Sequence, residues 1–348
     1  MSLFTKFKAQ WMTLYSRELC PSDWEEKQGL SDPVFRILCN HPGMNYKVGD
    51  ALGVFPTNPL SLVDSVLTAL RYDPSVSVIS RHIDDFMSIQ EFLISYVDLD
   101  KIPKSLRLFF PEDLEDSWSL AEAILFYQPQ IPLEMFVSSV MPLLPRFYSI
   151  ASAPTSLDKE IELLVRCVSF PGKIQLRYGL CSAFLCKDLH QGEAFRGFIQ
   201  STKHFTLEQK QFGKPLVMIG AGTGIAPYKG FLQHRLYSQD PGKNILFFGE
   251  RFEKDNFYYR DFLKELVVSD KLKLFTAFSR DSESKVYVQD VIEQQKELIQ
   301  ESYEQGAFFF VCGKKVLGSE IKHTLGSILG QEILKELILQ KRLVLDVY

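Results

Sequence analysis

The first hydrophobic positions of the chain fit two patterns. Residues on one face of a possible helix are Leu3, Phe4, Phe7, Trp11, Leu14 and Tyr15. Such a helix could bind a membrane surface or a partner. The stretch KAQWMTLYS (8–16) also alternates with the period of two that is typical of a strand. The strand-like runs VFRILCN (34–40) and ALGVFPT (51–57) follow, with turn-forming residues between them, and they favour the strand.

From about residue 60 to residue 140 the pattern changes to the helical period. Helices are predicted over 59–70, 89–99, 119–127 and 133–144. Strand patterns then resume over 146–152, 161–170, 173–179 and 194–201. We therefore expect a small antiparallel β-barrel, formed by 1–60 and 140–210, with an all-helical insert over 61–139.

From about residue 211 onward, apolar strands alternate with amphipathic helices. The predicted strands are 214–222, 244–251, 272–280 and 307–313, and the predicted helices are 228–239, 258–268, 288–299 and 317–340. This alternation indicates a parallel sheet that is covered on both faces. The segment 211–348 is therefore predicted to be a doubly wound α/β domain.

Composition narrows the class of protein. A chain of 348 residues with 46% hydrophobic and 24% charged residues is typical of a globular enzyme with two domains. The net charge of −4 gives no overall attraction to nucleic acid or anionic membranes. The six cysteines include no C-x-x-C pair, and we expect no metal site. The start shows no signal peptide, and no apolar run approaches the roughly 20 residues that span a bilayer. A cytoplasmic location is expected.

The stretch MIGAGTGIAP (218–227) carries the strongest chemical signal. Gly220, Gly222 and Gly224 lie where a buried strand turns into a helix. Glycines there let the backbone approach a ligand, and the N–H groups of the helix start favour an anion such as a pyrophosphate. The spacing is neither G-x-G-x-x-G nor a Walker A loop, which argues against a dehydrogenase-type site and an NTPase. A simple glycine-rich turn is the alternative.

Two further stretches are unusually polar. AFSRDSESKVYVQ (277–289) follows another predicted strand and could bind a ribose 2′-phosphate through its cationic and hydroxyl groups, although a solvated loop would look the same. PRFYSIASAP (145–154) places Arg146, Tyr148 and Ser149 within one short strand. A flat apolar ring with an anionic tail would need such a mixture, whereas a barrel strand with incidental polar residues is the alternative.

These motifs together resemble a known family. RFYSIAS, GLCSAFL, GAGTGIAP, FSRDSESKVYVQ, FVCG and the final LDVY occur in the order of the NADPH-dependent diflavin reductases, members of the ferredoxin–NADP⁺ reductase superfamily. The resemblance runs from near residue 8 to the last residue. The ending LDVY, with Tyr348 as its last residue, resembles the sulfite reductase flavoprotein more than the family members that carry tryptophan at this position. Departures are Ala221 for proline, Tyr228 for phenylalanine and Leu180 for valine, and all are mild.

The resemblance implies two nucleotide cofactors, FAD and NADPH. For FAD, Arg146 would bind a phosphate, Tyr148 would lie against the isoalloxazine and Ser149 near N5. A second FAD stretch would be Gly179, Leu180, Cys181 and Ser182. For NADPH, the pyrophosphate and nicotinamide pocket would be shaped by Gly222, Thr223, Gly224 and Pro227. The 2′-phosphate side would be bound by Ser279, Arg280, Lys285, Tyr287 and Gln289.

Further residues would act where the two rings meet. The resemblance places Cys312 by the nicotinamide C4, Asp346 where it steadies the nicotinamide, and Tyr348 on the flavin face. Together with Ser149, they are the predicted catalytic residues. Arg251 would add a phosphate contact, although a surface salt bridge is nearly as good an explanation. A buried structural thiol is the alternative for Cys312.

The implied activity is transfer of hydride from NADPH to FAD and then of electrons to an acceptor. The family carries an FMN domain, for which this sequence has no segment, so a separate acceptor is expected. It would be a flavodoxin, a ferredoxin or a haem protein such as the haem subunit of sulfite reductase. The alternatives are a ferredoxin or flavodoxin–NADP⁺ reductase, or a flavin-bearing assembly subunit of a haem sulfite reductase.

Overall fold

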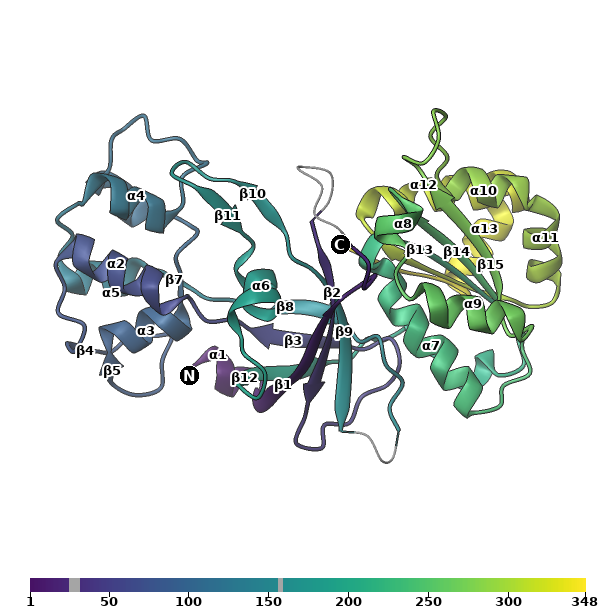
Figure 1. Ribbon diagram of the computed structural model, residues 1–348, viewed down its shortest axis with the longest axis horizontal. Helices are drawn as coiled ribbons and strands as arrows, with labels where there is room; N and C mark the ends of the chain where they lie inside the picture. Colours follow the sequence, from purple (N-terminus) through teal and green to yellow (C-terminus); the bar gives the residue numbers. More distant parts are fainter. Residues whose placement is uncertain (25–31, 156–158) are drawn as a thin grey trace. The chain divides into compact units, whose positions relative to one another are not determined.

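The computed structural model describes residues 1–24, 32–155 and 159–348 (Figure 1). The chain forms two compact units. The first comprises Met1–Leu14, Gly53–Phe147 and Cys167–Phe198, and the second comprises Tyr15–Leu52, Tyr148–Arg166 and Ile199–Tyr348. The division into 1–60 with 140–210, 61–139 and 211–348 stays a prediction.

A six-stranded antiparallel sheet has the strand order β8-β3-β12-β1-β2-β9. Its strands are β1 (Gln10–Leu19), β2 (Val34–Asn40), β3 (Ala51–Phe55), β8 (Arg146–Ser149), β9 (Glu160–Arg166) and β12 (Ala194–Gln200). The strand interpretation of the first segment is confirmed from Gln10 onward. The helical interpretation holds only for the one-turn α1 (Leu3–Lys6) before it, so a long amphipathic helix over residues 3–15 is wrong.

Four helices of the first unit pack around a common apolar core. They are α2 (Leu60–Leu70), α3 (Ile89–Tyr96), α4 (Leu120–Tyr127) and α5 (Leu133–Ser139). Two of them end earlier than predicted: α3 stops before residue 99 and α5 before residue 144. The reason is that β6 (Val97–Asp98) pairs with β7 (Met141–Pro142), and this pairing takes the ends of both helical patterns into extended backbone.

Smaller elements complete the first unit. The strand pairs are β4 (Ser77–Val78) with β5 (Met87–Ser88) and β10 (Ser169–Pro171) with β11 (Leu176–Tyr178), and the helical turns are η1 (Lys104–Phe109), α6 (Leu180–Ala183) and η2 (Phe184–Asp188). The strand predicted over 161–170 is interrupted, because β9 ends at Arg166 and β10 begins at Ser169.

The second unit contains a five-stranded parallel sheet with the order β15-β14-β13-β16-β17. Its strands are β13 (Leu216–Ala221), β14 (Asn244–Glu250), β15 (Lys273–Phe278), β16 (Phe308–Gly313) and β17 (Leu343–Val347). Successive side chains of a strand point to opposite faces. Leu216 and Met218 accordingly belong to one apolar cluster and Val217 and Ile219 to another. Both faces are therefore buried, as predicted.

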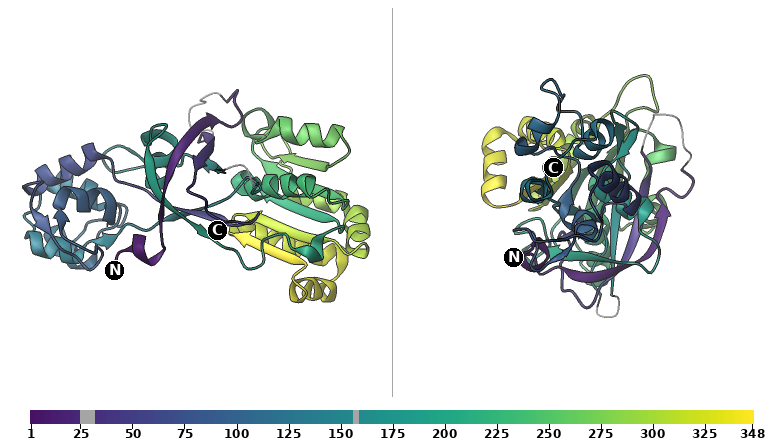
Figure 2. Two further views of the ribbon diagram at one scale, coloured as in Figure 1. Left: turned by 90° about the horizontal axis from the view of Figure 1, so that it is seen from below. Right: turned by 90° about the vertical axis from the view of Figure 1, so that its left-hand side faces the viewer.

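Helices on both faces of the parallel sheet contribute further side chains to these two apolar clusters (Figures 1 and 2). On one face lie α7 (Ala226–Tyr237) and α9 (Arg260–Val268), and on the other lie α10 (Val288–Gln294), α11 (Lys296–Glu304), α12 (Lys315–Leu329) and α13 (Gln331–Leu339). The remaining helical pieces are η3 (Gln209–Gln211), η4 (Gly222–Ile225) and α8 (Glu253–Asn256). The helix predicted over 317–340 is two helices, because Gly330 has φ +94°, a left-handed conformation that breaks the helix.

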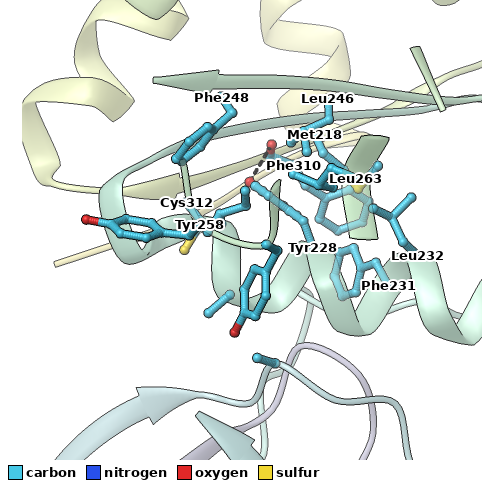
Figure 3. Close-up of a cluster of buried hydrophobic side chains, with 14 of the residues drawn as sticks. Met218, Tyr228, Phe231, Leu232, Leu246, Phe248, Tyr258, Leu263, Phe310 and Cys312 are labelled. Carbon is cyan, nitrogen blue, oxygen red and sulfur yellow. Dashed lines mark hydrogen bonds between the residues drawn. The ribbon is translucent and has the colours of Figure 1, made fainter. Parts of the chain in front are cut away.

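Helix α7 packs against the parallel sheet and also contacts β9 and the chain that follows β8. Tyr228 and Phe231 of α7 contribute to an aromatic cluster with Phe310 (Figure 3). The carboxylate of Glu162 accepts a hydrogen bond from Lys229 Nζ at 2.8 Å and forms an ion pair with Arg36, whose Nε lies 3.0 Å from Glu162 Oε2. Gln233 Oε1 of α7 also accepts from the N–H of Ala153 at 3.1 Å, which holds the chain after β8 against α7.

Candidate functional site

The glycine-rich loop lies where the sequence predicted it. Strand β13 ends at Ala221, η4 follows over Gly222–Ile225, and α7 begins at Ala226 with Pro227 in its first turn. Gly222 has φ +61°, and a Cβ atom on Gly224 would lie 2.3 Å from the carbonyl oxygen of Cys312. Glycine is therefore required at both positions. The start of a helix at the carboxyl end of a parallel strand presents N–H groups suited to an anion.

Two of the predicted catalytic residues are neighbours across the parallel sheet. The register pairs Gly220 with Cys312, and Cys312 with Asp346. Ser149, at the end of β8, joins them: its Oγ lies 3.5 Å from Asp346 Oδ2, and Cys312 Sγ lies 4.0 Å from the same oxygen. Two side chains that are far apart in sequence, those of Ser149 and Cys312, thus lie beside the carboxylate of Asp346.

Burial determines the protonation of this cluster. Burial raises the pKa of the Asp346 carboxyl, and the hydrogen bond from Ser149 offsets this only in part. Burial also raises the pKa of the Cys312 thiol well above its ordinary value, with the Asp346 charge adding to the effect. Cys312 is therefore a neutral thiol and not a nucleophilic thiolate.

The terminal Tyr348 completes this group. Its backbone N–H donates to the carbonyl of Gly313 at 3.1 Å, and its carbonyl accepts from the N–H of Lys315 at 3.2 Å. The phenolic oxygen lies 3.2 Å from Thr223 Oγ1 of the glycine-rich loop. The residue is nevertheless 59% exposed. The backbone of the chain end is thus fixed, while the ring stays open to solvent.

The polar residues after β15 lie beside the end of β14. The N–H of Ser279 donates to the carbonyl of Glu250 at 2.9 Å, and the N–H of Arg280 donates to the carbonyl of Arg251 at 2.8 Å. Ser279 is buried, whereas the side chains of Arg280, Lys285 and Tyr287 are exposed. Gln289 lies in the first turn of α10. The backbone bonds hold two strand ends together, and the exposed cations remain accessible to a ligand.

Sequence reasoning missed an ion pair beside the glycine-rich loop. Arg166 Nη2, at the end of β9, binds Glu250 Oε1, and Tyr258 Oη lies 3.2 Å from each of these two atoms. A Cβ atom on Gly222 would lie 3.5 Å from both Arg166 Nη2 and Glu250 Oε1. Each charge looked like an ordinary residue at a strand end, so only the tertiary structure reveals the pair.

The four residues of the RFYS motif, in strand β8, differ in their exposure to solvent. Arg146 and Phe147 are exposed, and Tyr148 and Ser149 are half-buried. The strand thus offers an arginine and aromatic side chains to the solvent. A cation and a ring surface suit a nucleotide with a flat apolar ring.

The GLCS motif forms the tight turn that begins α6 in the first unit. Ser182 Oγ donates to the carbonyl of Gly179 at 2.8 Å and accepts from the N–H of Val168 at 3.2 Å. Cys181 is buried, with Sγ 3.8 Å from the carbonyl oxygen of Val54, and Leu180 is half-buried. The Ser182 hydroxyl proton therefore closes the turn, and the backbone of the turn is the part suited to an anion.

A buried carboxylate that sequence reasoning also missed holds the chain leading into this turn. Glu122 Oε1 accepts from the N–H groups of Lys173 at 2.8 Å and Ile174 at 3.2 Å. Its Oε2 accepts from Arg177 Nη1 at 3.3 Å and from the Ser119 hydroxyl at 3.0 Å. Ser119 caps α4, and the spacing S-x-x-E is the signal that could have found Glu122.

Comparison with protein families identifies two domains in the chain. Residues 118–184 match the FAD binding domain, and residues 218–322 match the oxidoreductase NAD-binding domain. The second match contains the glycine-rich loop, Arg280 and Cys312. The chain thus carries an FAD-binding domain and an oxidoreductase NAD-binding domain, the pair that the resemblance to the ferredoxin–NADP⁺ reductases predicts.

Curated relatives of this chain are sulfite reductase [NADPH] flavoprotein alpha-components. The chain is 31% identical to that of Shewanella sp. (strain MR-4) over 96% of its length and 61% of the relative. It is 30% identical to that of Bacillus subtilis over 88% of its length and 56% of the relative. It is 29% identical to that of Mannheimia succiniciproducens over 86% of its length and 53% of the relative. The chain thus spans between half and two thirds of the length of these relatives.

Across the ranges 1–24, 32–155 and 159–348, no helix is long and apolar enough to cross a membrane.

Proposed function

We propose that this chain transfers hydride from NADPH to FAD and then passes electrons to a separate acceptor. The observation that carries the proposal is the gathering of Ser149, Cys312 and Asp346 beside the glycine-rich loop, with Tyr348 bonded to Thr223. When bound, FAD supplies the redox chemistry, since no protein side chain accepts a hydride. The residues of the chain bind, orient and shield the two nucleotides.

The residues present fit these cofactors. Gly222 gives the loop its left-handed turn without a side chain, which leaves the loop backbone bare for a ligand, and Gly224 lets the loop pack closely against the Cys312 carbonyl. We propose that Gly222, Thr223, Gly224 and Pro227 receive the pyrophosphate and nicotinamide of NADPH. For FAD, we propose that the ring and phosphates are bound by Arg146, Tyr148 and Ser149, and by the backbone of Gly179, Leu180, Cys181 and Ser182.

Each proposed catalytic residue has a role that follows from its surroundings. The Ser149 hydroxyl donates to Asp346 and is thereby oriented. The neutral Cys312 thiol offers a small uncharged surface for the nicotinamide ring. The Asp346 carboxylate favours the positive charge that a nicotinamide acquires on oxidation. The exposed ring of Tyr348 covers the place that the nicotinamide would take, so it has to move aside first.

The preference for NADPH is assigned to the loops after β14 and β15. We propose that Ser279, Arg280, Lys285, Tyr287 and Gln289, with Arg251, bind the 2′-phosphate side of NADPH. Arg280 and Lys285 are exposed cations, and Arg280 is held by its backbone bond to Arg251. A bidentate guanidinium–phosphate contact is among the strong charge-assisted hydrogen bonds.

Substitution of Arg280 tests this assignment. We expect Arg280→Ala to lower kcat/KM for NADPH by roughly ten- to hundred-fold, which corresponds to the loss of one charge-assisted contact. The kcat/KM for NADH should stay unchanged, because NADH lacks the 2′-phosphate. Lys273→Ala is the matched control, since Lys273 is an exposed cation at the opposite end of the same strand, β15. An equal loss for both coenzymes would refute the assignment.

The acceptor is proposed from the relatives. The relatives are named as flavoprotein components of sulfite reductase. We propose that the acceptor is a haem protein such as the haem subunit of sulfite reductase, and that both are cytoplasmic. Gel filtration of the two proteins together, with and without NADPH, tests this. Flavodoxin and ferredoxin, assayed for reduction under the same conditions, are the competing acceptors.

The finer architecture is also part of the proposal. We propose that the six-stranded sheet closes into a barrel and that residues 61–139 are a helical insert within it. A bridge between Ile150, just after β8, and Leu163 of β9 supports closure, because β8 and β9 are the two edge strands in the order. A closed barrel has no exposed edge, which would protect these strands from pairing with other chains.

A further inference from the structure

The ion pair of Arg166 and Glu250 lies beside the loop proposed to bind the dinucleotide pyrophosphate. The side chain of Glu250 is only 7% exposed and that of Arg166 is 23% exposed. Both approach to within 3.5 Å of the place that a Cβ atom on Gly222 would occupy. A buried carboxylate this close to an anion-binding loop would repel a phosphate unless another group cancelled its charge.

Both oxygens of the Glu250 carboxylate are already engaged. Oε1 binds Arg166 Nη2 and lies 3.2 Å from the Tyr258 hydroxyl, and Oε2 accepts from the N–H of Arg251 at 2.6 Å. An acidic residue at the end of a strand next to a glycine-rich loop binds the ribose hydroxyls in NAD-dependent folds. In this chain the Glu250 carboxylate already accepts from protein donors, so it is not available to bind ribose hydroxyls. Asp32 also acts electrostatically on Arg166 and adds further negative charge.

We propose that Arg166 is a positioning residue that cancels the charge of Glu250 beside Gly222 and thereby lets the loop accept the 5′-phosphate end of the dinucleotide. The inference rests on the proposed use of NADPH. It assigns to Arg166, on β9, a role in nucleotide binding, although Arg166 lies outside the residues matched to the NAD-binding domain. The partner that Arg166 acts through is Glu250, on β14.

Two nucleotide fragments separate this role from a general loss of stability. 2′-AMP carries only the 2′-phosphate, whereas 2′,5′-ADP also carries the 5′-phosphate that would reach the glycine-rich loop. Binding of both to the purified full chain would be measured by calorimetry for the wild type and for R166Q, E250Q and the double variant. Arg342→Gln is the control. Arg342 is also half-buried, but it bonds to the Ala307 and Tyr303 carbonyls at the amino ends of β16 and β17.

The expected pattern has three parts. R166Q weakens the binding of 2′,5′-ADP by about ten-fold, equivalent to about 1.4 kcal/mol, and leaves the binding of 2′-AMP unchanged. The double variant R166Q/E250Q regains most of the affinity for 2′,5′-ADP, because the uncancelled carboxylate is gone. R342Q changes neither affinity. If R166Q does not fold, E250Q provides the comparison: with the carboxylate neutral, Arg166 is uncancelled, so 2′,5′-ADP should bind at least as tightly as it does to the wild type, and weaker binding would contradict the inference.

Specific results would overturn the inference. It fails if R166Q binds 2′,5′-ADP as tightly as the wild type does. It also fails if the double variant is as weak as R166Q, since Arg166 would then act on the phosphate without Glu250. A wild-type chain that binds neither fragment would instead contradict the proposed use of NADPH. The two failures are thus distinguishable.

Discussion

Replacement of Glu122 by glutamine gives the sharpest test of how the turn at Gly179–Ser182 is positioned. The carboxylate accepts from Lys173 and Ile174 at one oxygen, and from Ser119 and Arg177 at the other. In Glu122→Gln, the amide NH₂ faces hydrogen-bond donors in either orientation. At least two hydrogen bonds are therefore lost in a residue that is only 6% exposed.

The size of the effect follows from these contacts. Two charge-assisted hydrogen bonds at about 1.5–3 kcal/mol each, or one broken buried ion pair, predict a loss of about 3–5 kcal/mol in the free energy of unfolding. For a domain of this size the loss corresponds to a fall of roughly 6–20 °C in Tm. Burial alone would raise the pKa of Glu122, but backbone hydrogen bonds from Ile174, Ser119 and Lys173 lower it below its ordinary value of 4.5. The stabilisation should therefore be present above pH 4.5 and be lost as the pH falls through the lowered pKa.

Chemical denaturation followed by tryptophan fluorescence measures the loss. Glu115→Gln is the control, because Glu115 binds the same Lys173, through Nζ at 2.7 Å, yet its side chain is 68% exposed. An exposed pair contributes about 0–1 kcal/mol, so this variant should be close to wild type. Since the β10–β11 hairpin leads into Gly179–Ser182, Glu122→Gln should also release FAD more readily. Equal stabilities of the two variants would refute the reasoning.

Three other changes have definite expected outcomes. Gly224→Ala places a Cβ atom 2.3 Å from the Cys312 carbonyl oxygen, so we expect a loss of about 1–3 kcal/mol in thermal denaturation and weaker NADP⁺ binding by calorimetry; unchanged values would contradict the close approach. Asp346→Asn should be more stable than wild type at neutral pH, because burial raises the pKa of Asp346 above its ordinary 3.8 and its ionised form is costly in the fold. That advantage should shrink as the pH falls toward 3.8, and a difference that grew on acidification would have the wrong sign. Removal of Tyr348 should relax the preference for NADPH over NADH in kcat/KM, because the displaced ring opposes entry of the nicotinamide, and an unchanged ratio would count against that gate.

Local patterns in the sequence were sufficient for most of the fold. Strand–helix alternation after residue 211 and the glycine-rich loop needed only periodicity and the conformational freedom of Gly222 and Gly224. Helix ends were less predictable. The ends of α3 and α5 depend on the pairing of β6 with β7, which joins segments more than forty residues apart in the chain. The strand β17 was missed because a short run at the chain end becomes a strand only by pairing with β16.

The candidate site depends still more on tertiary contacts. Ser149 and Asp346 are 197 residues apart in sequence, and only the resemblance to a family suggested that both act at one place. Arg166 and Glu250 were not suspected, because nothing local distinguishes them from solvated charges at strand ends. Glu122 was detectable in principle, since Ser119 and Glu122 have the spacing of a capping box, but its bonds to Lys173, Ile174 and Arg177 depend on the hairpin. Local rules thus find elements and loops, while ion pairs between distant segments require the structure.

The central claim is that one chain binds FAD and NADPH so that hydride passes between them. The most direct measurement is anaerobic titration of the FAD-loaded protein with NADPH, and separately with NADH, following the visible absorbance of the flavin. We expect stoichiometric bleaching by NADPH and much slower bleaching by NADH. A protein that retains no FAD, or one whose flavin stays oxidised in excess NADPH, would contradict the account.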